Sequence, residues 1–516
     1  MAEPSRKPQD EQEEAYLHAD EAEEEILQDD GDHLMDDMSG DEEITLQNDS
    51  SAHFDLHTDS IFCIAQHPLH TAIVMTGSGD DTAYIFDSTP QDERPLLPPS
   101  YESNPQPRQV RESLPAIAHL DGHTDSVNAV AFTEPRGEYA LTAGLDGKLR
   151  AWRDTTSNKN GTTWTFLAEV QEVDEINWLA TCPVRKDSTE EEYHSIVALG
   201  GNDGSVWVYR IDAQDTSQPI SIVGSFFQHT ASCTAGAWTP DGNLLATASE
   251  DGSFYVYDIF GAAAAAGISS SPGTQTIVGL TTADQRFAVE GGLYSVAIAP
   301  SGTFAAVGGA EGHIKVIGLP RLTSTTTSST AAKSKAKGKA SGAGTAAAAS
   351  GVGTLLASLQ AQTDGIETLS FSSPPLNFLA AGSVDGSIAL FDTAHRFAVR
   401  RHIRGAHEEA AVVKVEFVRD EPSSQATAAG PLATATGSIG SWLLTSVGMD
   451  GVVRRWDTRG GTAAAGHGLV KEWKGHLGIV ESEEGEQSGG ILGFVQGGGK
   501  TIVTAGDDGV SLVFEE

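Results

Sequence analysis

Adjacent carboxylates recur at short turns of this sequence. The last of these turns reads TAGDDGVSLVF and contains Asp507–Asp508, and further pairs are Glu250–Asp251 and Asp174–Glu175. Two neighbouring carboxylates can serve general acid–base catalysis, or they can bind a cation such as a lysine or arginine side chain. The elements that carry the pairs decide between these two kinds of chemistry.

The sequence contains no motif of a catalytic site. It lacks a glycine-rich phosphate loop before a helix, a GxSxG elbow, an HExxH motif and a cluster of Cys and His. The GGGK run at 497–500 ends a strand and is interpreted as a turn. Cys63, Cys182 and Cys233 have no CxxC spacing, which indicates a reducing compartment and neither a disulfide scaffold nor a zinc site. We therefore expect no enzyme activity, no metal and no cofactor.

The net charge of −40 is the most unusual bulk property of the chain. The first fifty residues hold nineteen acids against Arg6 and Lys7, which leaves −23 on the rest. Such a surface repels nucleic acid phosphates and anionic membranes and attracts basic partners. Solubility alone would also explain an acidic tail.

No targeting or membrane segment is visible in the sequence. There is no run of eighteen apolar residues, and the N-terminal residues lack the apolar core of a signal peptide. We expect a cytoplasmic protein without a membrane partner, with the nucleus left open as a second location.

The acidic turns belong to a unit that occurs eight times. Each copy has a hydrophobic strand, a stretch of small residues, an acid usually followed by Gly, and a strand of alternating apolar and polar residues. This pattern predicts a β-hairpin, and a further strand precedes each copy. The eight copies end at Asp87, Asp154, Asp212, Asp258, Gly318, Asp392, Asp457 and Phe514.

These copies resemble the WD40 repeat. Gly122–His123 and Gly475–His476 open two of them, each turn carries an acid, and Trp456–Asp457 is an unmodified closing dipeptide. The variants of that dipeptide are Phe86–Asp87, Tyr257–Asp258 and Phe391–Asp392. The resemblance covers residues 43–516 and implies an all-β, eight-bladed WD40 β-propeller with four strands in each blade.

The domain organisation follows from this resemblance. Residues 1–41 are predicted to be an acidic disordered tail and residues 42–516 the propeller. Insertions are expected at 89–113, 260–285 and 319–352, the last one disordered from about 320 to 352. They leave the shape of the rim near blades four to six open. The Lys333–Lys339 run could contact RNA or fold back on the acidic tail.

The last copy supplies only three strands of its blade. An open outer edge is a liability for a β-sheet protein, so a fourth strand is needed. We predict that Ile44 to Gln47, extending as far as Phe54, forms the outer strand of blade eight and closes the ring. The closed ring is expected to be a monomer.

Most of the turn acids have a structural role in such a repeat, because they accept hydrogen bonds from the turn and from the histidine that opens the copy. His57, His123, His229 and His476 are the matching histidines. The structural turn acids are Asp80, Asp146, Asp203, Asp251, Asp385, Asp450 and Asp508.

A second set of acids has no such explanation. Its members precede the turn acid or lie in the loop before the first strand of a blade, and both places lie on the top rim of a propeller. These candidate peptide-binding residues are Asp59, Asp125, Asp174, Glu175, Glu250, Glu367 and Asp507. A solvated surface acid remains the alternative for each one. With Tyr294, Trp178 and Met449 beside them, they would suit an extended Lys- and Arg-rich peptide.

Local sequence narrows the family. The acidic tail, HTDSIFCIAQHP, VQEVDEINWL, GGNDGSVWVYRI and the ending TAGDDGVSLVFEE resemble the fungal dedicated chaperones of the large-subunit ribosomal protein uL16 (older name L10), whose animal relative is the angio-associated migratory cell protein. The resemblance implies binding of the basic N-terminal segment of this ribosomal protein as it is synthesised, and delivery to the pre-60S particle without direct nucleic acid contact. The family's acidic face maps onto Asp125, Asp174 or Glu175, Glu367 and Asp507.

Two other functions remain open at this point. A WD40 scaffold or adaptor in signalling or ubiquitin transfer would bind several partners with little dependence on the acidic rim. A histone chaperone would use the acidic tail in place of the top face.

Overall fold

The computed structural model describes most of the repeat region. The described residues are 47–90, 111–156, 161–183, 195–268, 275–322, 351–419, 440–460, 468–481 and 487–516. The predicted tail at 1–41, the Lys333–Lys339 run and most of the insertion at 320–352 lie outside these ranges.

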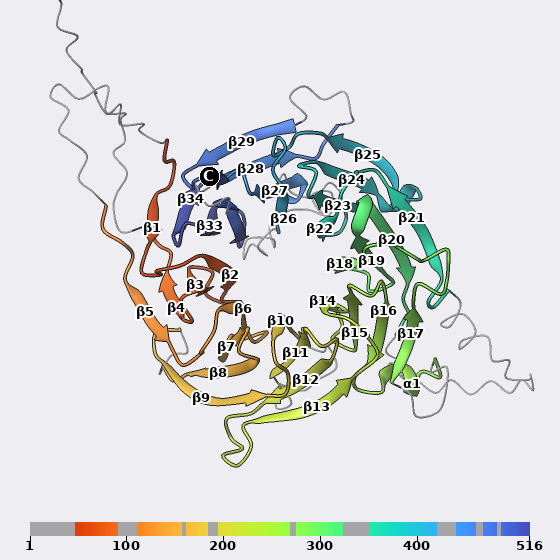
Figure 1. Cartoon of the computed structure of the whole chain (residues 1–516), viewed down its shortest axis with the longest axis horizontal. Coiled ribbons are helices and arrows are strands. Elements are labelled where there is room, and N and C mark those ends of the chain that lie inside the picture. Colours follow the sequence, from red (N-terminus) through yellow and green to blue (C-terminus); the bar gives the residue numbers. More distant parts are fainter. Residues whose placement is uncertain are drawn as a thin grey trace, which may run out of the picture. The chain divides into compact units, whose positions relative to one another are not determined.

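Eight four-stranded antiparallel sheets form a ring, which confirms the predicted eight-bladed propeller (Figure 1). We name the strands of a blade a to d from the centre outward. Blade 1 contains β2 (Ile61–Gln66), β3 (Ile73–Ser78), β4 (Ala83–Asp87) and β5 (Ala116–Leu120), and blade 2 contains β6 (Val127–Phe132), β7 (Tyr139–Gly144), β8 (Lys148–Asp154) and β9 (Trp164–Gln171). Blade 3 contains β10 (Ile176–Thr181), β11 (Ser195–Gly201), β12 (Val206–Ile211) and β13 (Ile220–Phe226), and blade 4 contains β14 (Cys233–Trp238), β15 (Leu244–Ser249), β16 (Phe254–Asp258) and β17 (Thr276–Leu280).

The second half of the ring repeats this arrangement. Blade 5 contains β18 (Leu293–Ile298), β19 (Phe304–Gly309), β20 (His313–Gly318) and β21 (Leu355–Gln360), and blade 6 contains β22 (Ile366–Phe371), β23 (Phe378–Ser383), β24 (Ile388–Asp392) and β25 (Ala398–Ile403). Blade 7 contains β26 (Val412–Phe417), β27 (Leu443–Gly448), β28 (Val452–Asp457) and β29 (Leu469–Lys474), and blade 8 contains β32 (Ile491–Val495), β33 (Thr501–Gly506), β34 (Ser511–Glu515) and β1 (Ala52–Phe54). The remaining elements are α1 (Ala262–Ala265), η4 (Ala310–Gly312), η5 (Thr393–His395), η7 (Gly440–Trp442), β30 (Val480–Glu481) and β31 (Gln487–Ser488).

Small and apolar residues in strand b explain how the blades stack. Every residue of β3, β7, β15 and β23 is buried, because neighbouring blades cover both faces of these sheets. Eight clusters of buried apolar side chains follow, one at each interface between adjacent blades. Trp152 and Trp456 belong to two of these clusters. Each blade therefore depends on its two neighbours for its core.

The N-terminal strand closes the ring as predicted. In β1, Ala52 pairs with Val513 and Phe54 with Ser511 of β34. The Phe54 side chain is fully buried and stacks on Phe86 of blade 1, with 4.3 Å between the ring centroids. One short strand thus completes blade 8 and fills the interface with blade 1.

The bounds of this strand differ from the prediction. Gln47 lies before β1, and Ile44 lies outside the described residues. Asn48 accepts the backbone N–H of Ser50 at 2.9 Å, and the backbone N–H of Asp49 donates to Lys474 O of blade 7. This local turn directs residues 48–49 toward blade 7, so the chain follows β34 only beyond it.

The ring has two distinct faces. The loops before strand a and the b–c turns lie on one face, which we call the top face; the a–b turns and c–d connections lie on the bottom face. The predicted insertions at 89–113, 260–285 and 319–352 fall between strands c and d of blades 1, 4 and 5. Their described ends lie at the bottom face, opposite the rim that carries the acids.

Ring closure can be tested with two truncations. We expect removal of residues 42–54 to lower the melting temperature strongly, because β34 loses its partner and Phe54 leaves the core. Differential scanning calorimetry would measure the change. Removal of residues 1–40 is the control and should leave the melting temperature unchanged; equal effects of both truncations would contradict closure by β1.

Candidate functional site

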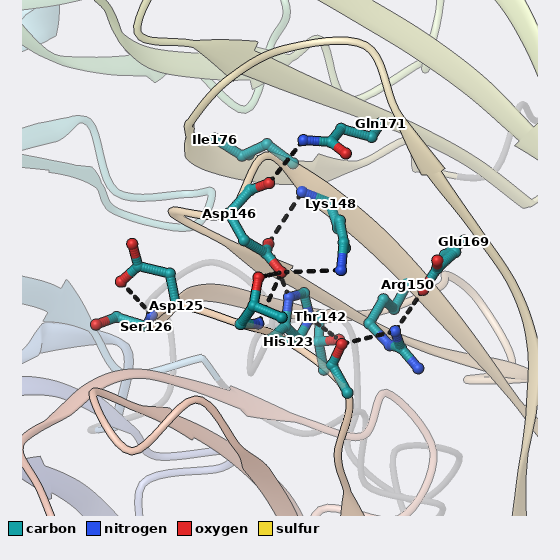
Figure 2. Close-up of polar contacts among 12 residues, drawn as sticks. His123, Asp125, Ser126, Thr142, Asp146, Lys148, Arg150, Glu169, Gln171 and Ile176 are labelled. Carbon is teal, nitrogen blue, oxygen red and sulfur yellow. Dashed lines mark hydrogen bonds and ion pairs between the residues drawn. The ribbon is translucent and has the colours of Figure 1, made fainter.

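The turn acid of blade 2 is held in a buried network (Figure 2). Asp146 Oδ1 lies 3.0 Å from His123 Nδ1, and the carboxylate accepts the backbone N–H groups of Thr124 and Lys148. His123 Nε2 lies 2.8 Å from Thr142 Oγ1. Burial alone would raise the pKa of Asp146, but these hydrogen bonds outweigh it and lower the pKa. This carboxylate is ionised and is used by the fold.

The same contact recurs in three further blades. The His–Asp pairs, with distances of 2.9, 2.8 and 3.0 Å, are His57–Asp80, His407–Asp450 and His476–Asp508. His407 is missing from the sequence prediction. The loop from His407 to strand a is one residue longer than the loop after His57, and Glu408 accommodates the extra residue with φ 55°. In the sequence GAHEE at 405–409 the histidine therefore has an unusual spacing from strand a, although in the structure it contacts the turn acid as the other histidines do.

The other three turn acids hold their turns without a hydrogen bond from a histidine in the described residues. His229 Nδ1 lies 2.6 Å from Ser253 Oγ and 4.0 Å from Asp251. Asp385 accepts the backbone N–H of Thr363 at 2.8 Å, and Asp203 accepts that of Ser205 at 2.8 Å. All seven predicted turn acids thus accept hydrogen bonds at the hairpin.

The predicted binding acids lie beside these networks on the top face. Asp59 and Asp125 each accept the backbone N–H of the following serine, at 2.7 and 2.8 Å. Figure 2 shows the hydrogen bond between Asp125 and Ser126, which is separate from the Asp146 network. In the described part of the chain, no other hydrogen bond reaches Asp125, so this carboxylate can accept a ligand.

Two further predicted binding acids accept hydrogen bonds from residues outside their own turn. Asp507 Oδ2 accepts the backbone N–H of Gly489 at 2.5 Å, and its main-chain oxygen accepts Ser60 Oγ at 3.0 Å. Glu175 Oε2 accepts Asn202 Nδ2 at 2.9 Å. The expectation that Asp507 has no structural partner is wrong, because the Gly489–Gly490 turn exposes an N–H group that the sequence does not reveal.

Acids from different blades approach one another. Burial and then the charges of Glu367, Glu250 and Asp364 raise the pKa of Tyr294. The Tyr294 ring and Glu367 Oε1 lie close together above Gly365, where a Cβ atom would be 3.5 Å from each of them. Burial and then Asp364 raise the pKa of Glu367. Blades 4, 5 and 6 thus assemble a cluster in which like charges oppose ionisation. A bound cation would relieve this repulsion.

Acids of blades 1 and 2 also influence each other. Burial and then the charge of Asp125 raise the pKa of Asp81. Asp81 occupies the position where most copies have Gly, with φ 63°. Asp81 and Asp364 are not among the binding residues predicted from the sequence. The available signals were the doubled acid in GDDT and the match of QTDG at Gln362–Gly365 to HTDS at His57–Ser60.

A β-bulge at the start of strand a gives one side chain in each blade an orientation different from that of its neighbours. In all eight blades the pairing of strands a and b shifts by one residue there, and the extra residue projects differently from its neighbours. We call these residues the bulge ring: Phe62, Asn128, Asn177, Thr234, Tyr294, Glu367, Val413 and Leu492. None of them is buried. Two of them, Glu367 and Tyr294, reach the top face, because a Cβ atom on Gly365, in the loop before strand a of blade 6, would lie 3.5 Å from both side chains.

Trp178 does not join this surface. It is 9% exposed and packs against Gly200 and Gly236, where a Cβ atom would collide with the indole ring. The expectation that Trp178 borders the acids is therefore wrong.

The described residues hold no helix with the length and apolar character needed to cross a membrane. In the same part of the chain, no three His, Cys, Asp or Glu side chains group so as to hold a metal ion.

Comparisons with known proteins agree with this architecture. The family model "WD domain, G-beta repeat" matches residues 48–87, 115–153, 220–258 and 353–392. The crystal structure of Chaetomium thermophilum Sqt1 bound to the N-terminus of ribosomal protein L10 is similar, with 48% identity, a TM-score of 0.71, and coverage of 91% of this chain and 100% of that chain.

Two curated relatives are also similar. The ribosome assembly protein SQT1 of Saccharomyces cerevisiae is 33% identical over 208 residues, which span 40% of each chain. The human angio-associated migratory cell protein is 21% identical over 83% of this chain and 74% of its own length.

Two aspartates of blade 2 provide a test of the structural and binding sets. We expect Asp146→Ala to lower the free energy of unfolding by about 2–4 kcal/mol, because His123 and two backbone N–H groups lose a buried acceptor. The matched control Asp125→Ala should change it by less than about 0.5 kcal/mol. Urea unfolding measures both, and equal losses would contradict the division into two sets.

Proposed function

This chain belongs to the WD40-repeat family as a homologue of Sqt1, and from that premise we propose that it is a ribosome biogenesis factor. In this proposal it is the dedicated chaperone of ribosomal protein L10. It binds the basic N-terminal segment of the newly made protein on its top face and delivers that protein to the pre-60S particle. The proposed role is binding without catalysis, in the cytoplasm and with the nucleus as a second location.

The observation that supports this proposal best is the convergence of carboxylates on the top face beyond those that hold the turns. Burial and then the charge of Asp125, in the loop before blade 2, raise the pKa of Asp81 in blade 1. Burial and then the charges of Glu367, Glu250 and Asp364, from blades 4 and 6, raise the pKa of Tyr294 in blade 5. Glu367 Oε1 and the Tyr294 ring share the space above Gly365. Two separate acidic clusters suit several basic side chains of one extended segment better than they suit a single cation.

The acidic clusters give the proposed mechanism its physical basis. Arg and Lys side chains would form charge-assisted hydrogen bonds with carboxylates that are held apart from the turn networks. The negative field also attracts a cationic chain before contact and speeds its capture. Once the segment is bound, its positive charges are no longer available to RNA phosphates. Ordered release would then depend on a competing acidic surface on the pre-60S particle.

The candidate binding residues remain Asp59, Asp125, Asp174, Glu175, Glu250, Glu367 and Asp507, to which we add Asp81 and Asp364. Glu367 has the strongest support, because it reaches the top face and its pKa is raised. Asp507 and Glu175 would need to bind a ligand in addition to their present partners. The scaffold and histone-chaperone alternatives have no specific observation in their favour.

Charge reversal on the top face tests the proposal. We expect the double variant Glu367→Lys, Asp507→Lys to abolish binding of a synthetic peptide with the N-terminal sequence of L10, because attraction becomes repulsion. Calorimetric titration at low and high salt measures the loss, and wild-type binding should weaken with salt. A control with Glu134→Lys and Glu138→Lys makes the same charge change on the bottom face. Normal peptide binding by the folded top-face variant would contradict the site.

The pH dependence of binding provides a second test. Burial and Asp364 raise the pKa of Glu367 above its ordinary value of 4.5, so it loses charge at a higher pH than an ordinary glutamate. A cation pairs only with the ionised form. Affinity should therefore fall as the pH falls from 7.5 to 5, with proton release on binding.

The variant Glu367→Gln isolates this contribution. It should bind more weakly than wild type at pH 7.5 and show a flatter pH profile. Titration in two buffers of different ionisation enthalpy measures the protons released. An unchanged profile in this variant would exclude Glu367 as the titrating group.

A further inference from the structure

The bulge ring divides into two parts of different chemistry. Blades 2 to 6 contribute polar residues, three of which bond to the neighbouring strand a: Asn128 to Ile176 O, Asn177 to Cys233 O and Thr234 to Leu293 O. Blades 7, 8 and 1 contribute only apolar residues. This apolar arc consists of Val413, Leu492 and Phe62.

The apolar arc is exposed although its members occupy strand positions. Phe62 is 40% exposed, and Val413 and Leu492 are partly exposed. Strand a lies innermost in every blade, so a large apolar side chain near the start of this strand would be expected to pack in the core. The bulge turns these three side chains out of the sheet instead. Exposed apolar groups on one face commonly mark a binding surface.

More apolar surface continues from this arc. Leu477 and Ile479 are each 43% exposed and lie in the loop between His476 and β32. The backbone N–H of Ile479 donates to Met449 O at 3.1 Å, which places this loop over the b–c turn of blade 7. The loops before strand a in blades 1 and 2 have no comparable insertion. Blade 8 thus adds apolar side chains to the sector that the arc occupies.

Carboxylates border the arc directly. A Cβ atom on Gly79 would lie 3.0 Å from Asp59 Oδ2 and 3.2 Å from Phe62 Cε2, so these two side chains share the space above that glycine. Asp507 connects the two halves of the sector, because it accepts Gly489 N–H beside the Leu477–Ile479 loop and Ser60 Oγ beside Asp59. A ligand on this sector meets apolar and negative groups together.

We propose that the apolar arc binds an aromatic or branched aliphatic side chain of the basic segment, next to a Lys or Arg held by Asp59. This inference rests on the proposed function and adds a specificity element to it. A segment that carries only positive charge would fill the acidic clusters and leave the arc exposed. A segment with an apolar side chain at the right spacing would also remove this surface from water, which favours binding.

The arc also gives the bound segment a direction. The acidic cluster around Tyr294 comes from blades 4 to 6, and the arc comes from blades 7, 8 and 1. A segment whose apolar side chain lies on the arc while its basic side chains lie on the blade 4 to 6 cluster would be bound in one orientation. Charge alone would allow either orientation.

Two peptides and two variants test the arc. The first peptide has the N-terminal sequence of L10, and the second has its aromatic and aliphatic residues replaced by serine with every charge kept. We expect Phe62→Ser and Leu492→Ser to weaken binding of the first peptide about tenfold and to leave binding of the second unchanged. The salt dependence should stay as in wild type, because no charge is removed.

The matched control is Phe166→Ser. Phe166 is 46% exposed on the outer strand β9, and its replacement should leave binding of both peptides unchanged. Thermal unfolding of each variant shows whether the ring is intact. If both arc variants bind the first peptide as wild type does, or if wild type binds both peptides equally, the apolar arc proposal is wrong while the charge-based site stands. Failure of wild type to bind the first peptide at low salt would overturn the proposed function itself.

Discussion

The pairing of β1 with β34 is the constraint on which the rest of the structure depends. Each blade buries its faces only against its neighbours, so an open ring would expose the apolar residues of two blades at once. Closure rests on three strand residues, the buried Phe54 ring and the backbone contact of Asp49 with blade 7. The top face exists as one surface because this contact holds blades 8 and 1 together.

The closed ring also explains why acids can serve two purposes. At the turns, buried carboxylates accept several hydrogen bonds, which lower the pKa of Asp146 and bring that of Asp251 to about 2. Beside them, Glu367 and Asp81 meet other acids, and burial and repulsion raise their pKa values. The first group is stable without a ligand. The second group lowers its free energy when a cation arrives, so the division is a matter of hydrogen-bond partners rather than residue type.

The sequence was sufficient for the fold because its hairpin unit recurs with an acid in each turn, and the missing strand of the last copy pointed to the N-terminus. The site was harder to predict. A bulge is a one-residue shift in pairing, and nothing in the residues around Phe62 or Leu492 distinguishes it from regular strand. Likewise, the partner of Asp507 is a backbone N–H of Gly489, which has no sequence signature. Positions set by backbone geometry are visible only in the folded chain.

Charge and shape contribute differently to a surface of this kind. Coulombic attraction acts over about 8–10 Å at physiological salt and does not distinguish one basic segment from another. The side chains of Phe62, Val413 and Leu492 act only at contact, and their placement on one sector is asymmetric. Because long-range attraction sets the rate of encounter, selectivity must come from short-range contacts that a wrong segment cannot make. An acidic face with an apolar arc combines both, and the bulge in strand a supplies the arc without disturbing the core of the blades.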